Sequence, residues 1–304
     1  CTMCSGGGGG NTRYPFASCT VNPSLAATWR GEDYSKLEPA PRRKVVLVAG
    51  GGLAGMHAAT VLARRGHRVS LYEASAELGG QWLIACQQDY KRESNFRELL
   101  ELTVRELGAS GAEVRMNQAL TPEVVKVAKP DVVVVATGAK VPTPDIPGAE
   151  RGEVVQGNDV LMDKARVGER AIVIGAGYVG MEVALHLAER GKRVYLLTRS
   201  KVGRKVGPAI RRTLLERLIE AGVYLFPDSP VVEILPGAVK YVADGEYRYL
   251  KGDSVVLTTG VKAETGLAQA LSQAGVEVHA IGDVVEPRDA FSALHEAAAL
   301  ARQI

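Results

Sequence analysis

Residues 44–73 read KVVLVAGGGLAGMHAATVLARRGHRVSLYE, and most of the expected architecture follows from this segment. Its apolar run Val45–Ala49 is typical of a buried parallel strand. Gly50, Gly52 and Gly55 follow with the spacing G-x-G-x-x-G. In this motif the first glycine makes a tight turn, the second lets backbone approach a pyrophosphate, and the third lets the helix pack closely on the strand. The segment therefore predicts a strand, turn, helix and second strand that bind a dinucleotide.

Glu73 ends this segment, at the end of the second expected strand. It stands about twenty residues past the glycine motif, where a carboxylate can accept hydrogen bonds from ribose hydroxyls. A glycine-rich turn by itself also serves plain packing of a strand on a helix. The strand before it, the helix after it and the acid at this distance together favour dinucleotide binding.

The same pattern recurs in residues 170–199, RAIVIGAGYVGMEVALHLAERGKRVYLLTR. Gly175, Gly177 and Gly180 stand 125 positions after the corresponding glycines of the first segment. An internal repeat of this kind predicts a second dinucleotide site. We therefore expect an α/β protein with two Rossmann-like, three-layer units.

The two repeats differ at the position of the acid. Thr198 stands where Glu73 stands in the first segment, and Arg199 and Ser200 follow it. An acid would repel a ribose 2′-phosphate, whereas a hydroxyl and a guanidinium would bind one. This difference favours NADPH over NADH, although a basic, solvated loop after a strand would look the same. Three more basic residues lie nearby: Lys201, Arg204 and Lys205.

Three short motifs could add groups to these sites. They are Gly80 and Gln81 in LGGQW, Thr137 and Gly138 in DVVVVATG, and Gly282 and Asp283 in VEVHAIGD. The glycines permit close approach of backbone to a ligand, and Asp283 could bind hydroxyls such as those of a flavin ribityl chain. The alternatives are an ordinary core strand with its turn for the second motif and a turn cap for Asp283.

The N-terminal 40 residues show no helical or strand period and contain a run of five glycines. Cys1, Cys4 and Cys19 lie here, and a Cys-x-x-Cys with a distant cysteine before a proline is typical of an iron-sulfur loop. A leader with idle cysteines and a zinc loop are the alternatives. Cys86 stands apart and is expected to be a buried packing thiol.

Composition narrows the class of protein. The 304 residues suffice for two domains, and 46% hydrophobic with 23% charged residues is ordinary for a globular chain. A net charge of +3 does not suggest nucleic acid as a partner. We expect no membrane span, no signal peptide and a cytoplasmic location. The five histidines show no metal-ligand spacing, and most of them are expected at the surface or in caps.

Further elements follow from apolar periodicity. We expect helices at residues 95–107, 209–221 and 290–303, and strands at 112–116, 223–226, 239–242, 247–250 and 254–258. Two more strands are expected within 131–138, where the four valines form the strand, and within 276–283, where the strand ends in Gly-Asp.

The joint order of these motifs resembles the flavoproteins with two dinucleotide-binding domains. The cysteines, followed by Val21-Asn22-Pro23, make the chain similar to the C-terminal part of the 2,4-dienoyl-CoA reductase and trimethylamine dehydrogenase family, the iron-sulfur members of the old yellow enzyme group. This resemblance implies an FAD domain at residues 41–148 and 264–304, an NAD(P)H domain at 149–263 inserted in it, and an iron-sulfur loop and linker at 1–40.

The resemblance also assigns cofactor contacts. It implies that FAD is bound by Gly50, Gly52, Gly55, Glu73, Gln81 and Asp283. The further candidate cofactor contacts are Gly80, Thr137, Gly138 and Gly282. The resemblance implies that NADPH, or alternatively NADH, is bound by Gly175, Gly177, Gly180, Arg199 and Ser200. It gives Cys1, Cys4 and Cys19 to a [4Fe-4S] cluster, but the family's third cluster cysteine should fall near position 7 or 8, and both are glycine here.

Family members usually carry an FMN-binding TIM barrel before these domains, and this sequence contains none. The resemblance therefore implies a barrel in a partner subunit or in the rest of a larger enzyme, within an oligomeric complex. The expected function is transfer of hydride from NADPH to FAD and of single electrons, through the cluster, to FMN. The alternatives are a self-sufficient NAD(P)H diaphorase resembling the small glutamate synthase subunit, and a module whose nucleotide site is structural. No catalytic acid or base is assigned.

Overall fold

The structure is a computed structural model, and it describes residues 19–26, 36–87, 95–272 and 275–304. The described chain forms two compact units. Unit 1 contains the residues up to Lys140 and from Lys262 onward, and unit 2 contains Val141–Val261. These limits differ slightly from the expected boundaries after residues 148 and 263.

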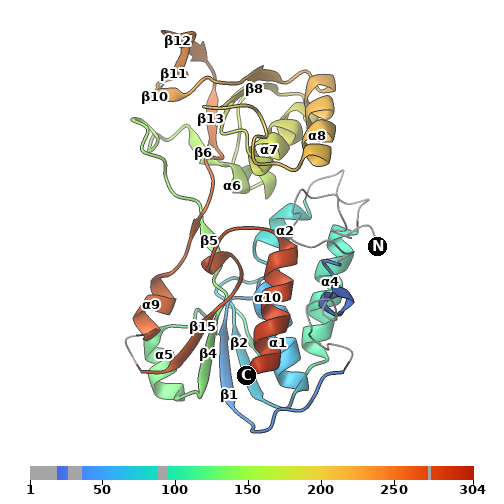
Figure 1. Cartoon of the computed structure of the whole chain (residues 1–304). Coiled ribbons are helices and arrows are strands. Elements are labelled where there is room, and N and C mark those ends of the chain that lie inside the picture. Colours follow the sequence, from blue (N-terminus) through green and yellow to red (C-terminus); the bar gives the residue numbers. More distant parts are fainter. Residues whose placement is uncertain (1–18, 27–35, 88–94, 273–274) are drawn as a thin grey trace. The chain divides into compact units, whose positions relative to one another are not determined.

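Unit 1 is built on a parallel sheet of five strands in the order β15-β4-β1-β2-β3 (Figure 1). The strands are β1 (Val45–Ala49), β2 (Arg68–Tyr72), β3 (Glu113–Arg115), β4 (Val132–Val135) and β15 (Glu277–Ala280). The chain leaves β1 toward β2 on one side and later returns to β4 on the other. Strand order therefore reverses at β1, and in open α/β sheets ligands bind beyond the carboxyl ends of the strands at such a point.

Helices cover both faces of this sheet. Figure 1 shows α1 (Leu53–Arg64), α4 (Phe96–Gly108) and α10 (Ala290–Gln303) on one face, and α5 (Pro122–Ala128) and α9 (Gly266–Ser272) on the other. Alternate residues of β1 enter the two cores: Val46 and Val48 pack under α1 and α10, and Leu47 and Ala49 pack with Val125 and Leu271. This alternation is why the apolar run Val45–Ala49 forms a strand with two buried faces. Short elements complete the unit: η1 (Pro23–Ala26), α2 (Gln81–Ala85) and η3 (Gly282–Val284).

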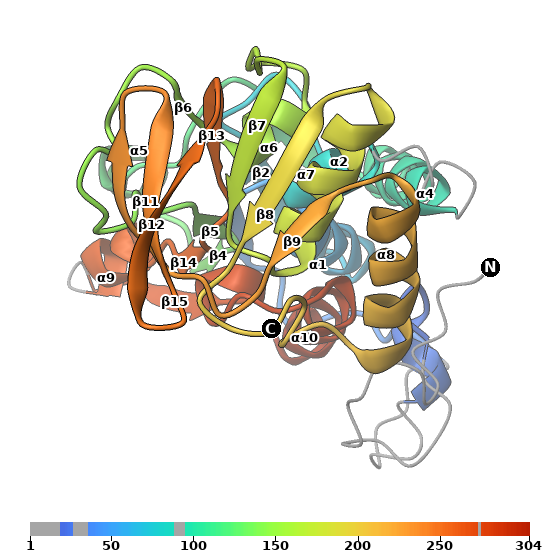
Figure 2. The ribbon, with the colours of Figure 1, turned by 90° about the horizontal axis from the view of Figure 1, so that it is seen from above.

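Unit 2 repeats the parallel sheet, in the order β6-β13-β7-β8-β9. The strands are β6 (Val154–Gln156), β7 (Arg170–Ile174), β8 (Arg193–Leu197), β9 (Tyr224–Phe226) and β13 (Ser254–Leu257). The helices of this unit are α6 (Gly157–Leu161), α7 (Tyr178–Glu189) and α8 (Pro208–Glu220). An antiparallel sheet of β10 (Val231–Leu235), β11 (Ala238–Ala243) and β12 (Glu246–Lys251) covers the face opposite α7 and α8 (Figure 2). Its residues Ile234, Val239 and Tyr241 are buried against the parallel strands.

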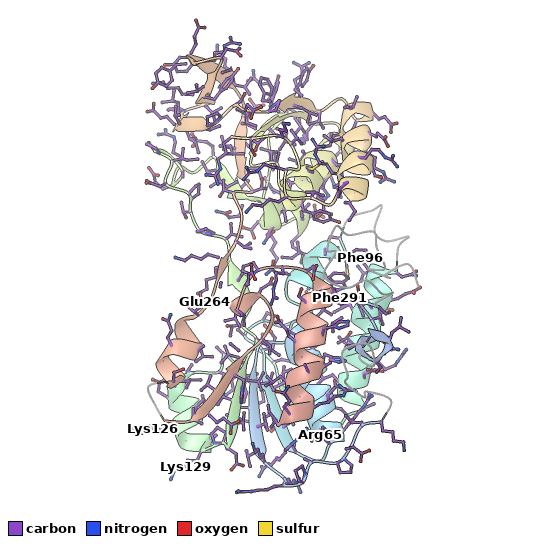
Figure 3. All side chains as sticks on the ribbon, in the orientation of Figure 1. Arg65, Phe96, Lys126, Lys129, Glu264 and Phe291 are labelled. Atoms are coloured by element: carbon purple, nitrogen blue, oxygen red, sulfur yellow. The ribbon has the colours of Figure 1, made fainter. Side chains whose placement is uncertain are left out.

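The chain enters and leaves unit 2 through one narrow ribbon. Strands β5 (Ala139–Lys140) and β14 (Lys262–Ala263) pair antiparallel, with Lys140 opposite Lys262. Glu264, labelled in Figure 3, donates its N–H to the Gly138 carbonyl at 3.0 Å and forms an ion pair with Lys140 at 2.5 Å. The Lys140 ammonium holds the pKa of the Glu264 carboxyl below its usual range, chiefly through this hydrogen bond. The two connections are therefore fastened to each other within unit 1.

The expected fold class is confirmed: both units are Rossmann-like and three-layered. The helix expected at residues 290–303 has those bounds, and the other expected elements shift by a few residues at their ends. Cys86 is buried, as expected. The expectation of surface histidines is wrong for His67, His186 and His295, which are buried. Within the described residues, no helix is long and apolar enough to cross a membrane.

Candidate functional site

The first glycine turn is held by close backbone contacts. Gly50 has φ +104°, and a Cβ there would lie 2.4 Å from the Ala136 carbonyl oxygen, just past β4. A Cβ on Gly55 would lie 1.9 Å from the Gly50 carbonyl oxygen. Neither position admits a side chain, so two of the three glycines are required by the fold itself.

Gly52 is different. It precedes α1 with extended backbone angles, φ −74° and ψ 179°, which any residue can adopt. A Cβ at this position would have no atom within 4 Å. The free backbone N–H groups of the first helical turn lie beside this open space and favour an anion. The cradle therefore suits the pyrophosphate of a dinucleotide, and glycine here keeps the approach clear.

Glu73 lies against this turn. Its Oε2 accepts a hydrogen bond from the Gly51 N–H at 2.6 Å, and its Oε1 accepts from the Ser75 N–H and hydroxyl, each at 2.7 Å. These donors fix the carboxylate beside the phosphate cradle. Oε2 keeps acceptor capacity, since an ionised carboxylate can accept about four hydrogen bonds, two at each oxygen, and Oε2 accepts only one here. Glu73 can therefore bind ribose hydroxyls while it braces the turn.

The three other motifs of unit 1 meet at the same end of the sheet. The Gln81 side chain donates from Nε2 to Oδ2 of Asp283 at 3.0 Å, across 202 positions of sequence. Gly138 has φ +76°, and its Cβ position would lie 4.0 Å from the same Gln81 nitrogen. A Cβ on Gly80 would lie 3.4 Å from the Gly52 Cα. Thr137 points elsewhere, because its hydroxyl donates to the Glu264 carbonyl at 3.2 Å.

The second glycine turn repeats the first. Gly175 has φ +108°, and its Cβ would lie 2.5 Å from the Thr258 carbonyl oxygen. A Cβ on Gly180 would lie 1.9 Å from the Gly175 carbonyl oxygen, whereas a Cβ on Gly177 would meet no atom within 4 Å. The Thr258 hydroxyl adds a hydrogen bond to the Gly175 carbonyl at 2.7 Å. Unit 2 therefore holds a second open cradle, before α7.

The loop after β8 presents the expected basic group. Thr198 is buried, and its backbone bonds to Phe226 and Ser229 at 3.0 and 2.7 Å, which anchors the start of the loop. Arg199 is exposed, and it forms no ion pair with any described residue. Ser200 is half-buried. A guanidinium and a hydroxyl therefore lie one and two positions after Thr198, which follows β8 as Glu73 follows β2.

The cysteine loop lies mostly outside the described residues, which include Cys19 but not Cys1 or Cys4. The Cys19 Sγ accepts a hydrogen bond from the Asn22 N–H at 3.3 Å, and its carbonyl bonds to Nε2 of His295 at 2.9 Å. The Phe291 ring, labelled in Figure 3, stacks on His295 with centroids 3.8 Å apart. Within the described residues, no group of three or more His, Cys, Asp or Glu side chains could hold a metal ion.

Sequence reasoning missed two aspartates that brace the sheets. Asp131 Oδ2 accepts from the Val45 N–H at 2.7 Å, and Asp253 Oδ2 accepts from the Arg170 N–H at 2.8 Å. Each aspartate precedes the strand, β4 or β13, that pairs with the strand before the glycine turn of its unit, β1 or β7. Comparison of the two halves could have found them, since each stands directly or nearly directly before an apolar run. The Arg170 guanidinium, hydrogen-bonded to Asp253, holds the pKa of that carboxyl below its usual range.

Sequence reasoning also missed Glu296 and Arg288, which surround the Gly282–Asp283 turn. Glu296 accepts a hydrogen bond from the Gly282 N–H at 2.8 Å, and Arg288 donates its N–H to Asp283 at 3.0 Å. No local pattern in the sequence predicts either contact.

Comparison with known proteins agrees with this geometry. Residues 43–290 match the family model of pyridine nucleotide-disulphide oxidoreductases. The chain is 38% identical over 274 residues to an NADH oxidase from Thermoanaerobacter brockii, covering 87% of this chain and 41% of that protein. It is 32% identical over 314 residues to a metal reductase from Desulforamulus reducens, covering 92% of this chain and 46% of that protein.

Among solved structures, a 2-naphthoyl-CoA reductase in complex with 2-naphthoyl-CoA superposes with a TM-score of 0.87 at 27% identity. The match covers 94% of this chain and 43% of that chain. The present chain thus spans less than half the length of these three relatives.

The family match covers most of the chain, including both glycine turns. Together with the relatives, it confirms the resemblance to flavoproteins with two dinucleotide-binding domains, and it supports binding of FAD and NAD(P)H. The chain therefore belongs to the pyridine nucleotide-disulphide oxidoreductase family.

Proposed function

We propose that this chain is the electron-input part of a larger flavoenzyme, in which unit 1 binds FAD and unit 2 binds NADPH. The observation that carries the proposal is the pair of cradles at Gly52 and Gly177, each open where a Cβ would stand and each preceding a helix. When bound, the nicotinamide supplies a hydride and the flavin accepts it and can release electrons singly.

The residues of this chain bind and orient the two cofactors. In unit 1, Gly52 and the first turn of α1 take the pyrophosphate of FAD, Glu73 binds the ribose hydroxyls, and Asp283 binds hydroxyls of the ribityl chain. Gln81 orients the Asp283 carboxylate. In unit 2, Gly177 and the first turn of α7 take the pyrophosphate of the nicotinamide cofactor. No side chain is needed as an acid or base, since hydride transfer between the cofactors moves no proton of the protein.

The onward route is a second part of the proposal. Cys1, Cys4 and Cys19 bind an iron-sulfur cluster that passes electrons to an FMN-binding barrel, in a partner subunit or in the rest of a longer chain, within a cytoplasmic complex. The support is the resemblance of the cysteine motif and the greater length of the relatives. The only described cysteine of the set, Cys19, lies in unit 1 and is fastened to α10 through His295.

One relative favours a second candidate function. The T. brockii protein is named an NADH oxidase, which suggests NADH as donor and turnover without a further acceptor subunit. Anaerobic titration of the purified chain with NADPH and with NADH separates these readings. Bleaching of the flavin absorbance by NADPH at low concentration supports the proposal, and an electron paramagnetic resonance signal in the reduced protein tests the cluster. Bleaching by neither coenzyme contradicts hydride input altogether.

The coenzyme preference depends on Arg199. Replacing Arg199 by Ala should raise the KM for NADPH about 10-fold or more and leave the KM for NADH within about threefold, because a charge-assisted hydrogen bond to phosphate contributes roughly 1.5–3 kcal/mol. Steady-state kinetics with a dye acceptor measures both constants. Arg204→Ala, an exposed basic residue of the same loop, is the matched control. Equal losses for the two coenzymes would contradict the assignment of Arg199 to the 2′-phosphate.

A further inference from the structure

The turn that carries Asp283 is held by two side chains, Glu296 of α10 and Arg288 just before that helix, which we call the clamp. Glu296 bridges two donors: its Oε2 accepts from the Gly282 N–H at 2.8 Å, and its Oε1 accepts from the Arg288 guanidinium. Arg288 is in turn bound to the turn through its own N–H, which donates to Oδ1 of Asp283 at 3.0 Å. The Arg288 Nε also donates to the Glu286 carbonyl at 3.2 Å. Glu296 and Arg288 therefore hold the loop between η3 and α10 closed on itself.

This clamp acts on a turn with little freedom of its own. Gly282 has φ +71°, and a Cβ there would lie 3.1 Å from the Ala54 Cβ in the first turn of α1. Gly282 is buried, and its N–H donates to the Glu296 carboxylate rather than to a backbone carbonyl. The side chains of Glu296 and Arg288 are 31% and 28% exposed, so their pairing is only partly screened by water.

The Asp283 carboxylate is oriented from two directions. Gln81 Nε2 holds Oδ2 at 3.0 Å, and the Arg288 N–H holds Oδ1 at 3.0 Å. With both oxygens engaged once, the carboxylate keeps acceptor capacity for hydroxyl donors of a ligand. The angle at which it meets that ligand then depends on where Arg288 lies, and Glu296 fixes Arg288.

We propose that Glu296 and Arg288 are positioning residues for FAD, which act through Asp283 and the Gly282 backbone. The proposal rests on the proposed function, because it assumes that Asp283 meets the flavin. Glu296 and Arg288 hold the Gly282–Asp283 turn in its binding conformation before FAD arrives. This pre-organisation increases the affinity for FAD.

The test measures FAD affinity of the whole chain after flavin removal, by quenching of flavin fluorescence. We expect Glu296→Ala to weaken FAD about 10- to 30-fold, because the Gly282 N–H and the Arg288 guanidinium both lose their acceptor. Glu296→Gln keeps an amide oxygen for Gly282 and should lose only about threefold. Glu101→Ala, at an exposed acid on α4 with no printed contact to Glu296 or Arg288, is the matched control and should bind FAD like the wild type.

A double-mutant cycle with Asp283→Ala distinguishes positioning from a general loss of stability. If Glu296 acts through Asp283, then Glu296→Ala should weaken FAD little further in the Asp283→Ala background, and the two losses should not multiply. The thermal midpoint of each FAD-free variant serves as the stability readout. Losses that multiply fully, or a Glu296→Ala protein with unchanged FAD affinity, overturn the clamp proposal and leave FAD binding intact. A wild-type chain that binds no FAD overturns the proposed function instead, and the clamp proposal with it.

Discussion

Gly52 and Gly55 stand three positions apart in one turn, yet an added methyl group would meet opposite surroundings. At Gly55 it would collide with a backbone oxygen at 1.9 Å, and at Gly52 it would enter open space. The same contrast recurs at Gly180 and Gly177. Two residues of one motif therefore serve different purposes, one the packing of helix on strand and the other the approach of a ligand.

This contrast predicts separable effects of alanine. Gly52→Ala should change the free energy of unfolding by no more than about 1 kcal/mol and weaken FAD binding at least about 10-fold, because the new methyl occupies the pyrophosphate cradle. Gly55→Ala should destabilise the chain by roughly 3 kcal/mol or more, since backbone must move. Urea unfolding and flavin titration measure the two effects.

Gly177→Ala is the matched control in unit 2. It should raise the KM for the nicotinamide cofactor and leave FAD content unchanged. A Gly52→Ala protein that binds FAD like the wild type would contradict the cradle.

His57 couples stability to pH. Burial, and then the positive charges of Arg302, His295 and Arg64, lower the pKa of His57 to about 4. The unfolded chain takes up this proton near pH 6.5, whereas the folded chain resists it. Between these pKa values the unfolded state binds more protons, so stability must fall as pH falls.

The expected loss between about pH 7.5 and about pH 5 is at most about 2 kcal/mol, because His57 is only partly shielded from water. Urea unfolding at the two pH values measures it. His57→Gln removes the titrating group, so its stability should fall less over the same interval. A wild type and variant with parallel pH dependence would show that His57 is not the source.

At the scale of elements, both parallel sheets contain the same hydrogen bond between an aspartate side chain and the first residue of a neighbouring strand. Asp131 precedes β4 and binds the first N–H of β1, and Asp253 precedes β13 and binds the first N–H of β7. In both units the aspartate N–H also donates to the carbonyl of the residue that it braces, at 2.9 Å for Val45 and 2.7 Å for Arg170. The duplication therefore extends beyond the glycine turns to the opposite end of the strands.

Removing either brace should weaken its own sheet. Asp131→Ala leaves the Val45 N–H without its acceptor and should cost about 1 kcal/mol of unfolding free energy. Asp131→Asn keeps an acceptor oxygen and should recover most of that loss. Equilibrium unfolding in urea tests both variants. Equal losses for Ala and Asn would mean that the hydrogen bond contributes nothing.

The elements that could be predicted from sequence are those with a single strong local cause. The strands β1 and β7 and the helices α1 and α7 follow from apolar runs and glycine spacing, and α10 follows from its helical period. The strand β10 was missed because only Ile234 of its five residues is buried and it is an edge strand, paired with β11 alone in the small sheet. The short helices α5, α6 and α9 give too few turns for a period to emerge.

The candidate site divides in the same way. The glycines, Glu73 and Arg199 occupy positions that a repeated motif specifies, so sequence locates them. Contacts between distant segments leave no local trace: Gln81 meets Asp283 across 202 positions, and Glu296 reaches back one loop to Gly282. These contacts can be predicted only once the strand order is known, because that order brings β1, β4 and β15 together.

At the scale of the whole molecule, unit 1 closes its own sheet without residues of unit 2. Its five strands all come from the segments before Lys140 and after Lys262, and these two lysines face each other in the β5–β14 ribbon. Unit 2 therefore takes the place of the loop that joins the paired strands β5 and β14. Closing a longer loop costs only little more conformational entropy than closing a short one.

Deleting residues 141–261 and joining Lys140 to Lys262 through Asn-Gly should therefore give a folded protein, because a two-residue turn of this kind closes an antiparallel pair. We expect a cooperative unfolding transition and retained FAD binding, with no response to NADPH or NADH. Circular dichroism, flavin fluorescence and coenzyme titration measure these properties. An aggregated product, or one without a cooperative transition, would show that unit 1 depends on its insertion.

The facing lysines also make unit 2 an exchangeable cassette. Under the proposed function, a nicotinamide-binding domain of different coenzyme preference could be grafted between the same two residues without replacing any residue of unit 1 proposed to bind FAD. The ribbon would then let coenzyme choice evolve, or be engineered, independently of the proposed flavin site.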